Sequence, residues 1–188
     1  MAEMLKLDNI HKTFNPGTIN EKIALNGVNL TLNEGDFVTV IGGNGAGKST
    51  TLNAIAGVWP IDSGKIYIGG DDVTKLSEHK RAKYLGRVFQ DPMTGTATTM
   101  SIEENMAIAA RRGEKRGLSW GITHQERDTY REMLKALDLG LEDRLTSKVG
   151  LLSGGQRQAI TLLMASIKKP KLLLLDEHTA ALAPKTAA

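Results

Sequence analysis

The chain has 188 residues, 40% of them hydrophobic and 24% charged, which is enough for one globular core or for a core with a small appended subdomain. Its net charge of +3 and its 4% aromatic content disfavour a nucleic-acid partner, which needs strong positive charge or stacking platforms. The sequence predicts no targeting segment and no membrane-spanning helix, and the lack of cysteine excludes disulfides and thiolate metal sites and fits a reducing cytoplasm.

The first third of the chain predicts strands, then a loop, then a helix. Leucine and valine alternate with polar residues at 5–7 and 28–32, which is typical of antiparallel strands with one solvent-exposed face. The segment "DFVTVI" at 36–41 predicts an apolar strand that leads into a glycine-rich loop and then the helix "KSTTLNAIAG" at 48–57. Further short strands are predicted within 63–72 and at 87–90.

Helices are predicted to dominate from Asp91 onward. Capping-box patterns, in which Ser or Thr precedes Glu by three residues, predict helices that begin after Ser101 and after Thr123. A third helix is predicted from Ser153 to Pro170, and the run "KLLLLD" then indicates a parallel strand covered on both faces. We expect the apolar stripes of the second and third helices to pack in a local core; they comprise Tyr130, Met133, Leu134 and Leu137, and Ile160, Leu163, Met164 and Ile167.

The densest basic patch is "ARRGEKRG" at 110–117. Its glycines and Glu114 indicate a solvated loop, and a contact with a partner protein is the second interpretation.

The segment "GGNGAGKST" at 42–50, called here the phosphate loop, matches the pattern G-x-x-x-x-G-K-[ST] and is the strongest single signal. Small residues let several backbone N–H groups converge on phosphate oxygens, and the following helix presents its positive end. Lys48 adds a point charge, and the Ser49 hydroxyl can ligate Mg²⁺. A merely flexible glycine loop would not require the order Gly47, Lys48, Ser49 between a strand and a helix.

Two carboxylates, Asp176 and Glu177, follow the predicted strand at 172–175. In open parallel sheets ligands bind beyond the carboxyl ends of the strands, so Asp176 is expected to hold the magnesium shell. Glu177 is expected to orient or deprotonate a water that attacks a γ-phosphate. The alternative is an acidic pair that simply faces solvent, and His178 is interpreted as neither base nor metal ligand.

The segment "LSGGQ" at 152–156, called here the signature segment, predicts a second anion-binding helix start. A capping box explains Ser153 and Gln156. It does not explain Gly154 and Gly155, because each weakens the first helical turn by roughly 1 kcal/mol relative to Ala.

With these motifs in their order, the sequence resembles the ATP-binding subunit of ATP-binding-cassette (ABC) transporters over nearly its whole length. "VFQDP" looks like the family's glutamine loop, which implies that Gln90 senses magnesium and the attacking water. Phe14 falls where the family places an aromatic residue that stacks on adenine, although one aromatic near a strand end is more often packing. The resemblance implies an α/β fold of the P-loop NTPase type: a central mixed or parallel sheet, an N-terminal antiparallel subdomain and an inserted helical subdomain.

The resemblance also implies the site. Its cofactors are ATP and Mg²⁺. The implied parts are a nucleotide-binding core at 1–90, a helical subdomain at 91–152 and the signature helix with the magnesium strand at 153–188. The implied catalytic residues are Glu177, Gln90 and Lys48, and the implied metal ligands are Ser49, Gln90 and Asp176. The implied nucleotide contacts are Phe14, Gly42, Asn44, Gly45, Ala46, Gly47, Lys48, Ser49, Thr50, Ser153, Gly154, Gly155 and Gln156.

The resemblance further implies partners. Two copies would face head to tail, so that the signature segment of one closes over ATP held by Lys48 of the other. The helical subdomain would contact a membrane permease, which places the chain at the cytoplasmic face of the plasma membrane. The wording "DEHTAAL" resembles that of a subset of bacterial uptake systems. A soluble cassette acting on DNA or ribosomes is less favoured, because the chain has one phosphate loop and no sustained heptads.

The sequence departs from the family pattern near its end. Ala183 stands where the family has an aspartate, and none of the four histidines follows a further strand, so the family's switch histidine has no counterpart. We therefore expect a shortened subunit that binds phosphate but hydrolyses ATP poorly, and a non-catalytic nucleotide-binding remnant is the alternative.

Overall fold

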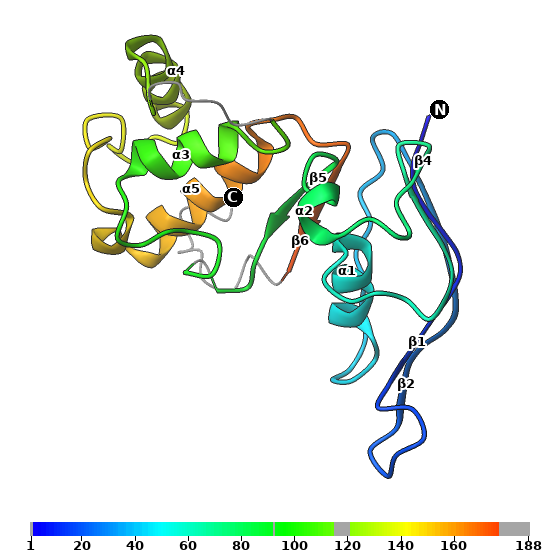
Figure 1. The fold of residues 1–188 in the computed structure, drawn as a ribbon. Coiled ribbons are helices and arrows are strands. Elements are labelled where there is room, and N and C mark those ends of the chain that lie inside the picture. The colour runs from blue at the N-terminus through cyan, green and yellow to red at the C-terminus, as the bar shows by residue number, and fades with distance from the viewer. Residues whose placement is uncertain (1, 92, 115–120, 177–188) are drawn as a thin grey trace. The chain divides into compact units, whose positions relative to one another are not determined.

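The computed structural model describes residues 2–91, 93–114 and 121–176. The chain forms two compact units, Met1–Leu85 and Gly86–Ala188, and each is described below by itself (Figure 1). The predicted boundary at residue 90 lies five residues beyond this division. Within the described residues, no helix is long and apolar enough to cross a membrane.

The first unit is built on a four-stranded antiparallel sheet in the order β2-β1-β3-β4 (Figure 1). The strands are β1 Glu3–Phe14, β2 Lys22–Asn33, β3 Ser63–Ile68 and β4 Asp71–Asp72. Alternate residues of β1 and β3 face the core, because side chains on a strand point to opposite faces in turn. The alternating buried set includes Leu5, Leu7, Ile66 and Ile68, and Ile10 is buried after a register shift between Leu7 and Ile10. The predicted antiparallel opening is confirmed.

The strand predicted at 36–41 is wrong. This segment has no regular structure, and its large apolar side chains are exposed; Phe37 and Ile41 are 85% and 88% accessible. An apolar run becomes a strand only when neighbouring strands accept its backbone hydrogen bonds. Among the residues that the structure describes, no strand pairs with it.

Two helices complete the first unit: α1 Lys48–Ala56, which follows the phosphate loop as predicted, and the single turn α2 Glu78–Arg81. Arg81 is 1% exposed, and its guanidinium donates to backbone carbonyls around the carboxyl end of α1. The acceptors are Ala54 (2.6 Å), Ile55 (2.9 Å), Leu76 (3.0 Å) and Thr74 (2.9 Å). Burial lowers the pKa of Arg81 because it disfavours the charged form.

The second unit contains a two-stranded sheet of β5 Leu85–Val88 and β6 Leu172–Leu175. The Asp176 N–H donates to the Val88 carbonyl at 3.1 Å, so both strands end at the same edge and run parallel. The predicted return to a parallel strand after Pro170 is confirmed, whereas β5 ends two residues before the expected 90. A Cβ built on Gly86 would lie 2.3 Å from the Ala165 carbonyl oxygen, so this position of β5 must be glycine.

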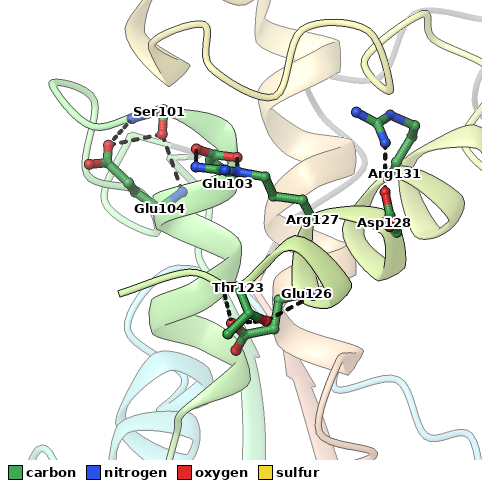
Figure 2. Close-up of polar contacts among 8 residues, drawn as sticks. All are labelled: Ser101, Glu103, Glu104, Thr123, Glu126, Arg127, Asp128 and Arg131. Atoms are coloured by element: carbon green, nitrogen blue, oxygen red, sulfur yellow. Dashed lines mark hydrogen bonds and ion pairs between the residues drawn. The ribbon is translucent and has the colours of Figure 1, made fainter. Parts of the chain in front are cut away.

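The described part of the second unit also contains three longer helices: α3 Ile102–Ala110, α4 His124–Lys135 and α5 Gly154–Ser166. A short 3₁₀ turn, η1 Val149–Leu151, precedes α5. All three predicted capping boxes are confirmed, and Figure 2 shows those of Ser101 with Glu104 and Thr123 with Glu126. The helices enclose one apolar cluster, which includes Ile102, Met106, Tyr130, Leu134, Leu141, Val149, Ile160 and Met164, as the predicted stripes require.

Ion pairs tie α3 to α4. The Glu103 carboxylate accepts two hydrogen bonds from the Arg127 guanidinium, at 2.8 and 3.1 Å (Figure 2). Arg111 pairs with Glu126 at 2.9 Å. The Thr123 N–H is the main cause that holds the pKa of Glu126 below its ordinary value, and the Arg111 charge adds to it.

The prediction of a solvated loop at 110–117 is wrong for its first two arginines. Arg111 is half-buried in its pair with Glu126, and half-buried Arg112 donates to the Met164 carbonyl of α5 at 2.9 Å. Burial lowers the pKa of Arg112. These arginines hold helices together. Residues 115–117 lie outside the described part of the chain.

Candidate functional site

The phosphate loop ends at an open helix start. Gly47 is the N-cap of α1 and makes no side-chain cap bond, whereas α3, α4 and α5 each begin with a closed capping box. The first N–H groups of a helix have no partner inside the helix and carry its positive dipole end. At α1 no described side chain caps them, so they are left for an acceptor from outside.

Backbone crowding explains the glycines of the loop. Gly45 and Gly47 have φ of 82° and 87°, in the left-handed region that favours glycine. A Cβ on Gly47 would lie 2.7 Å from the Ala24 carbonyl oxygen, and one on Gly42 would lie 3.0 Å from the Ala46 Cβ. The loop is therefore a tightly folded cradle and not merely a flexible connection.

Lys48 folds back across this cradle. Its ammonium donates to the carbonyls of Gly42 at 2.6 Å and Gly43 at 3.0 Å. The positive charge thus lies over the concave side of the loop, where a phosphate oxygen can replace a carbonyl as acceptor. Ser49 and Asn44 are exposed and Thr50 is half-buried, so these polar groups are accessible at the same loop.

Phe14 ends β1 and has an aromatic neighbour that is distant in the sequence. The rings of Phe14 and Trp59 meet edge to face, with centroids 5.1 Å apart and planes at 84°. Lys12 places its ammonium 5.6 Å from the centroid of the Phe14 ring. No local pattern links residues 14 and 59, because only the fold of the first unit brings them together.

Asp62 holds the strand that carries Phe14. Its carboxylate accepts from the Thr13 N–H at 2.5 Å and from the Lys12 ammonium at 3.0 Å. The Thr13 hydrogen bond is the largest cause that lowers the pKa of Asp62, followed by Lys12. The carboxylate therefore stays charged and fixes the backbone beside the Phe14 ring.

The signature segment opens α5 in the second unit. Ser153 Oγ accepts from the Gln156 N–H at 3.3 Å, and Gln156 Oε1 accepts from the Ser153 N–H at 3.2 Å. Cβ atoms built on Gly154 and Gly155 would meet no described atom within 4 Å. Nothing described in this chain demands glycine at either position, so these glycines leave room for a group from outside.

Arg157 braces the turn before the signature segment. Its guanidinium donates to the carbonyls of Val149, Gly150 and Leu152, at 3.4, 3.2 and 3.1 Å. Arg157 lies outside the residues for which the sequence predicts a role. Its contacts fix the path of η1 into α5.

Gln90 and Asp176 lie at the same edge of the β5–β6 sheet. Asp176 follows β6 directly and bonds to the last residue of β5, and Gln90 stands two residues beyond that strand. Gln90 is exposed and Asp176 is half-buried. The structure thus brings these two expected magnesium ligands to one edge. Glu177, His178 and Ala183 lie outside the described residues.

The donor groups suit a magnesium-bound phosphate ester. A serine hydroxyl, a glutamine amide oxygen and an aspartate carboxylate are hard oxygen ligands of the kind that Mg²⁺ prefers. The described residues contain no group of three or more histidine, cysteine, aspartate or glutamate side chains that could hold a metal ion.

An ATP-binding cassette of the P-loop class is defined by three features of this chain. These are a phosphate loop before a helix, an antiparallel opening sheet and a helical unit with a glycine-rich helix start. A family model described as "ABC transporter" matches residues 25–180. The chain belongs to this family, and the fold class and the ATPase class expected from its motifs are confirmed.

Relatives with known names are also ATP-binding proteins of transport systems. The chain is 41% identical over 189 residues to a tyrosine transport ATP-binding protein of Clostridioides difficile (strain R20291), covering 98% of this chain and 73% of that protein. It is 37% identical to the spermidine/putrescine import ATP-binding protein PotA of Haemophilus ducreyi (strain 35000HP / ATCC 700724), covering 95% of this chain and 44% of that one. The chain therefore spans about three quarters of the first relative and less than half of the second.

Solved structures show the same fold. The chain superimposes with a TM-score of 0.81 on a dimeric, post-hydrolysis state of the ATP-binding cassette MJ0796 bound to ADP and Pi, at 32% identity and covering 97% of this chain and 78% of that one. A nucleotide-free cassette from an ABC transporter matches with a TM-score of 0.77 at 30% identity, covering 98% of this chain and 73% of that one.

Proposed function

We propose that this chain is the ATP-binding subunit of a bacterial ABC importer and that it binds ATP with Mg²⁺ at the phosphate loop. The open start of α1 carries this proposal, because free helix N–H groups, a glycine cradle and the Lys48 ammonium converge there. A relative named as a spermidine/putrescine import ATP-binding protein supports import as the direction. Another relative is named as a tyrosine transport ATP-binding protein, so the named solutes differ and the proposal includes no transported solute.

Each proposed residue has a distinct task. The phosphate loop and Lys48 bind the β- and γ-phosphates, with Gly42, Asn44, Gly45, Ala46, Gly47 and Thr50 shaping or lining the cradle. Phe14 stacks on the base. A bound Mg²⁺ would neutralise charge on the phosphates, and Ser49, Gln90 and Asp176 are the residues that would hold it. Glu177 orients the water that attacks the γ-phosphate, and Gln90 senses that water and Mg²⁺.

The signature segment acts on a second copy. Gly154 and Gly155 leave the N–H groups at the start of α5 approachable, and Ser153 and Gln156 hold that start in place. In the proposed assembly these groups contact ATP held by Lys48 of the other copy. The dimeric cassette among the similar structures supports the pairing of two copies. The helical unit then contacts the permease on the cytoplasmic side of the membrane.

Calorimetric titration with ATP and Mg²⁺ tests the proposal. We expect the wild-type chain to bind ATP and the Lys48→Ala variant to bind at least about tenfold more weakly, because it loses a charge-assisted contact with phosphate. Lys80→Ala, which removes an exposed lysine of α2, is the control and should bind like wild type. Equal affinity of the Lys48 variant and wild type would contradict the assignment of the phosphate loop.

The role of Glu177 has its own test. Glu177→Gln keeps the size of the side chain and removes its basicity, so ATP affinity should persist while phosphate release in the presence of the permease falls. Unchanged turnover in that variant would reject Glu177 as the base.

A further inference from the structure

A second lysine lies against the phosphate loop. Lys22 begins β2, and a Cβ built on Gly45 of the phosphate loop would lie 3.4 Å from the Lys22 Nζ. No motif marks this residue, since the pattern that defines the loop begins twenty residues later. The ammonium of Lys22 therefore reaches the cradle from the start of β2, which is distant from the loop in the sequence.

The register of the sheet places Lys22 beside Phe14. The two residues are Cα partners in the antiparallel pair of β1 and β2. Residues directly opposite each other on such strands project to the same face of the sheet and are close enough to interact. Lys22 thus stands between the ring proposed to stack on the base and the loop proposed to bind the phosphates.

Lys22 differs from its neighbouring lysines in its partners. The Lys12 ammonium is paired with Asp62, and the Lys48 ammonium donates to two loop carbonyls. Within the described residues, the exposed side chain of Lys22 makes no hydrogen bond and no ion pair. No described residue neutralises its charge, which is available to an anion in the cradle.

We infer that Lys22 is a further nucleotide-binding residue, which contacts a phosphate oxygen of the bound nucleotide. This inference rests on the proposed function, since it assumes that the phosphate loop binds ATP. Lys22 adds affinity for the phosphate chain without reading the base. Because the Lys22 ammonium and the phosphate are exposed to water, the gain in nucleotide affinity is modest and falls as salt screens the two charges.

The test compares three variants by calorimetry with ATP, ADP and adenosine. Lys22→Gln removes the charge and keeps a long polar side chain, and Lys22→Arg keeps the charge. Lys80→Gln removes an equally exposed lysine of the same unit. We expect Lys22→Gln to bind ATP and ADP about fivefold more weakly, in line with one exposed charge pair, and to bind adenosine like wild type. Lys22→Arg and Lys80→Gln should retain wild-type affinity.

The salt dependence of ATP affinity gives a second readout, which would not change if Lys22 had only a structural role. The affinity difference between wild type and Lys22→Gln should shrink as sodium chloride is raised from about 0.05 to 0.5 M, since the Debye length shortens. The thermal midpoints of all variants should agree, because the Lys22 side chain is exposed.

Three outcomes overturn the inference. The first is an ATP affinity of Lys22→Gln within twofold of wild type, and the second is an equal loss of adenosine and ATP affinity in that variant, which would place its effect at the base. A wild-type chain that does not bind ATP removes the proposed function and this inference together. A wild-type chain that binds ATP while the Lys22 variant is unchanged removes this inference alone.

Discussion

Arg81 carries a buried charge whose hydrogen-bond partners are all backbone carbonyls. Two of its four acceptors, Ala54 and Ile55, belong to the last turn of α1, where the negative end of the helix dipole favours a cation. The guanidinium also fills the space beside Gly57, whose Cβ would lie 2.8 Å from the Arg81 Nε. The helix that begins at the phosphate loop is therefore anchored at its far end by one side chain.

We expect Arg81→Met to destabilise the first unit by about 2–4 kcal/mol, because it leaves several buried carbonyls without a donor. Arg81→Lys should recover part of the loss, since an ammonium cannot reach all four acceptors. The measurement is a urea titration followed by Trp59 fluorescence in a Trp120→Phe background, as the chain has two tryptophans. Lys80→Ala is the surface control. A loss below 1 kcal/mol for Arg81→Met would show that water replaces the guanidinium.

The sequence could not single out Arg81 or Lys22. Arg81 stands in the run "HKRAK", whose basic residues are typical of a solvated helix face, and its acceptors are up to 27 residues away. Lys22 and Gly45, which lie close together in the structure, are similarly far apart in the sequence. By contrast, the motif residues Gly47 and Lys48 could be predicted, because the requirements of phosphate binding act on neighbours in the chain.

At the scale of elements, local chemistry predicted the helix starts and failed at one strand. The capping boxes at Ser101, Thr123 and Ser153 need only residues three apart, so the sequence contains all of their determinants. The run at 36–41 has the composition of a buried strand, but a strand depends on partners that are distant in sequence. None of the described strands pairs with this run.

The signature helix offers a prediction in which stability and function change in opposite directions. Gly154 and Gly155 adopt conformations open to any residue, and a Cβ at either would meet open space among the described atoms. Replacing both by Ala should therefore stabilise α5, by up to about 1 kcal/mol per position. The added methyl groups should weaken the ATP-driven association of two copies, because they obstruct the approach of phosphate to the helix start.

Two measurements on the Gly154→Ala, Gly155→Ala variant separate these effects. Thermal unfolding should show a higher midpoint than wild type. Sedimentation of the Glu177→Gln background with ATP should show fewer dimers when the two alanines are present. If association stays at the level of the parent, the open space at these glycines is not where the second nucleotide binds.

At the scale of the whole molecule, the chain has two hydrophobic cores that are built from different elements, and each carries part of the proposed ATP-binding machinery. The first unit packs a sheet against α1, and the second packs three helices into one cluster. The cluster could be predicted from helical periodicity in the stripes of α4 and α5. The division after Leu85 could not be placed closely, because β5 continues the chain across it without a glycine- or proline-rich linker.

The largest exposed apolar run of the described residues leads directly into the phosphate loop. Phe37, Val38, Val40 and Ile41 are all exposed, and an unpaired apolar segment of this kind is prone to pair with another chain. We therefore expect the 188-residue chain to self-associate as its concentration rises, and we expect Val38→Lys with Val40→Lys to reduce this association, because charges oppose strand pairing.

Light scattering over a concentration series measures the association, and Ile19→Lys provides a matched control. Ile19 is fully exposed at the tip of the β1–β2 hairpin, but it stands alone among polar residues. A scattered apolar side chain of this kind contributes little to association, so Ile19→Lys should behave like wild type. If both lysine variants reduce association equally, added charge is the cause and not the run at 37–41. If neither does, another surface mediates the contact.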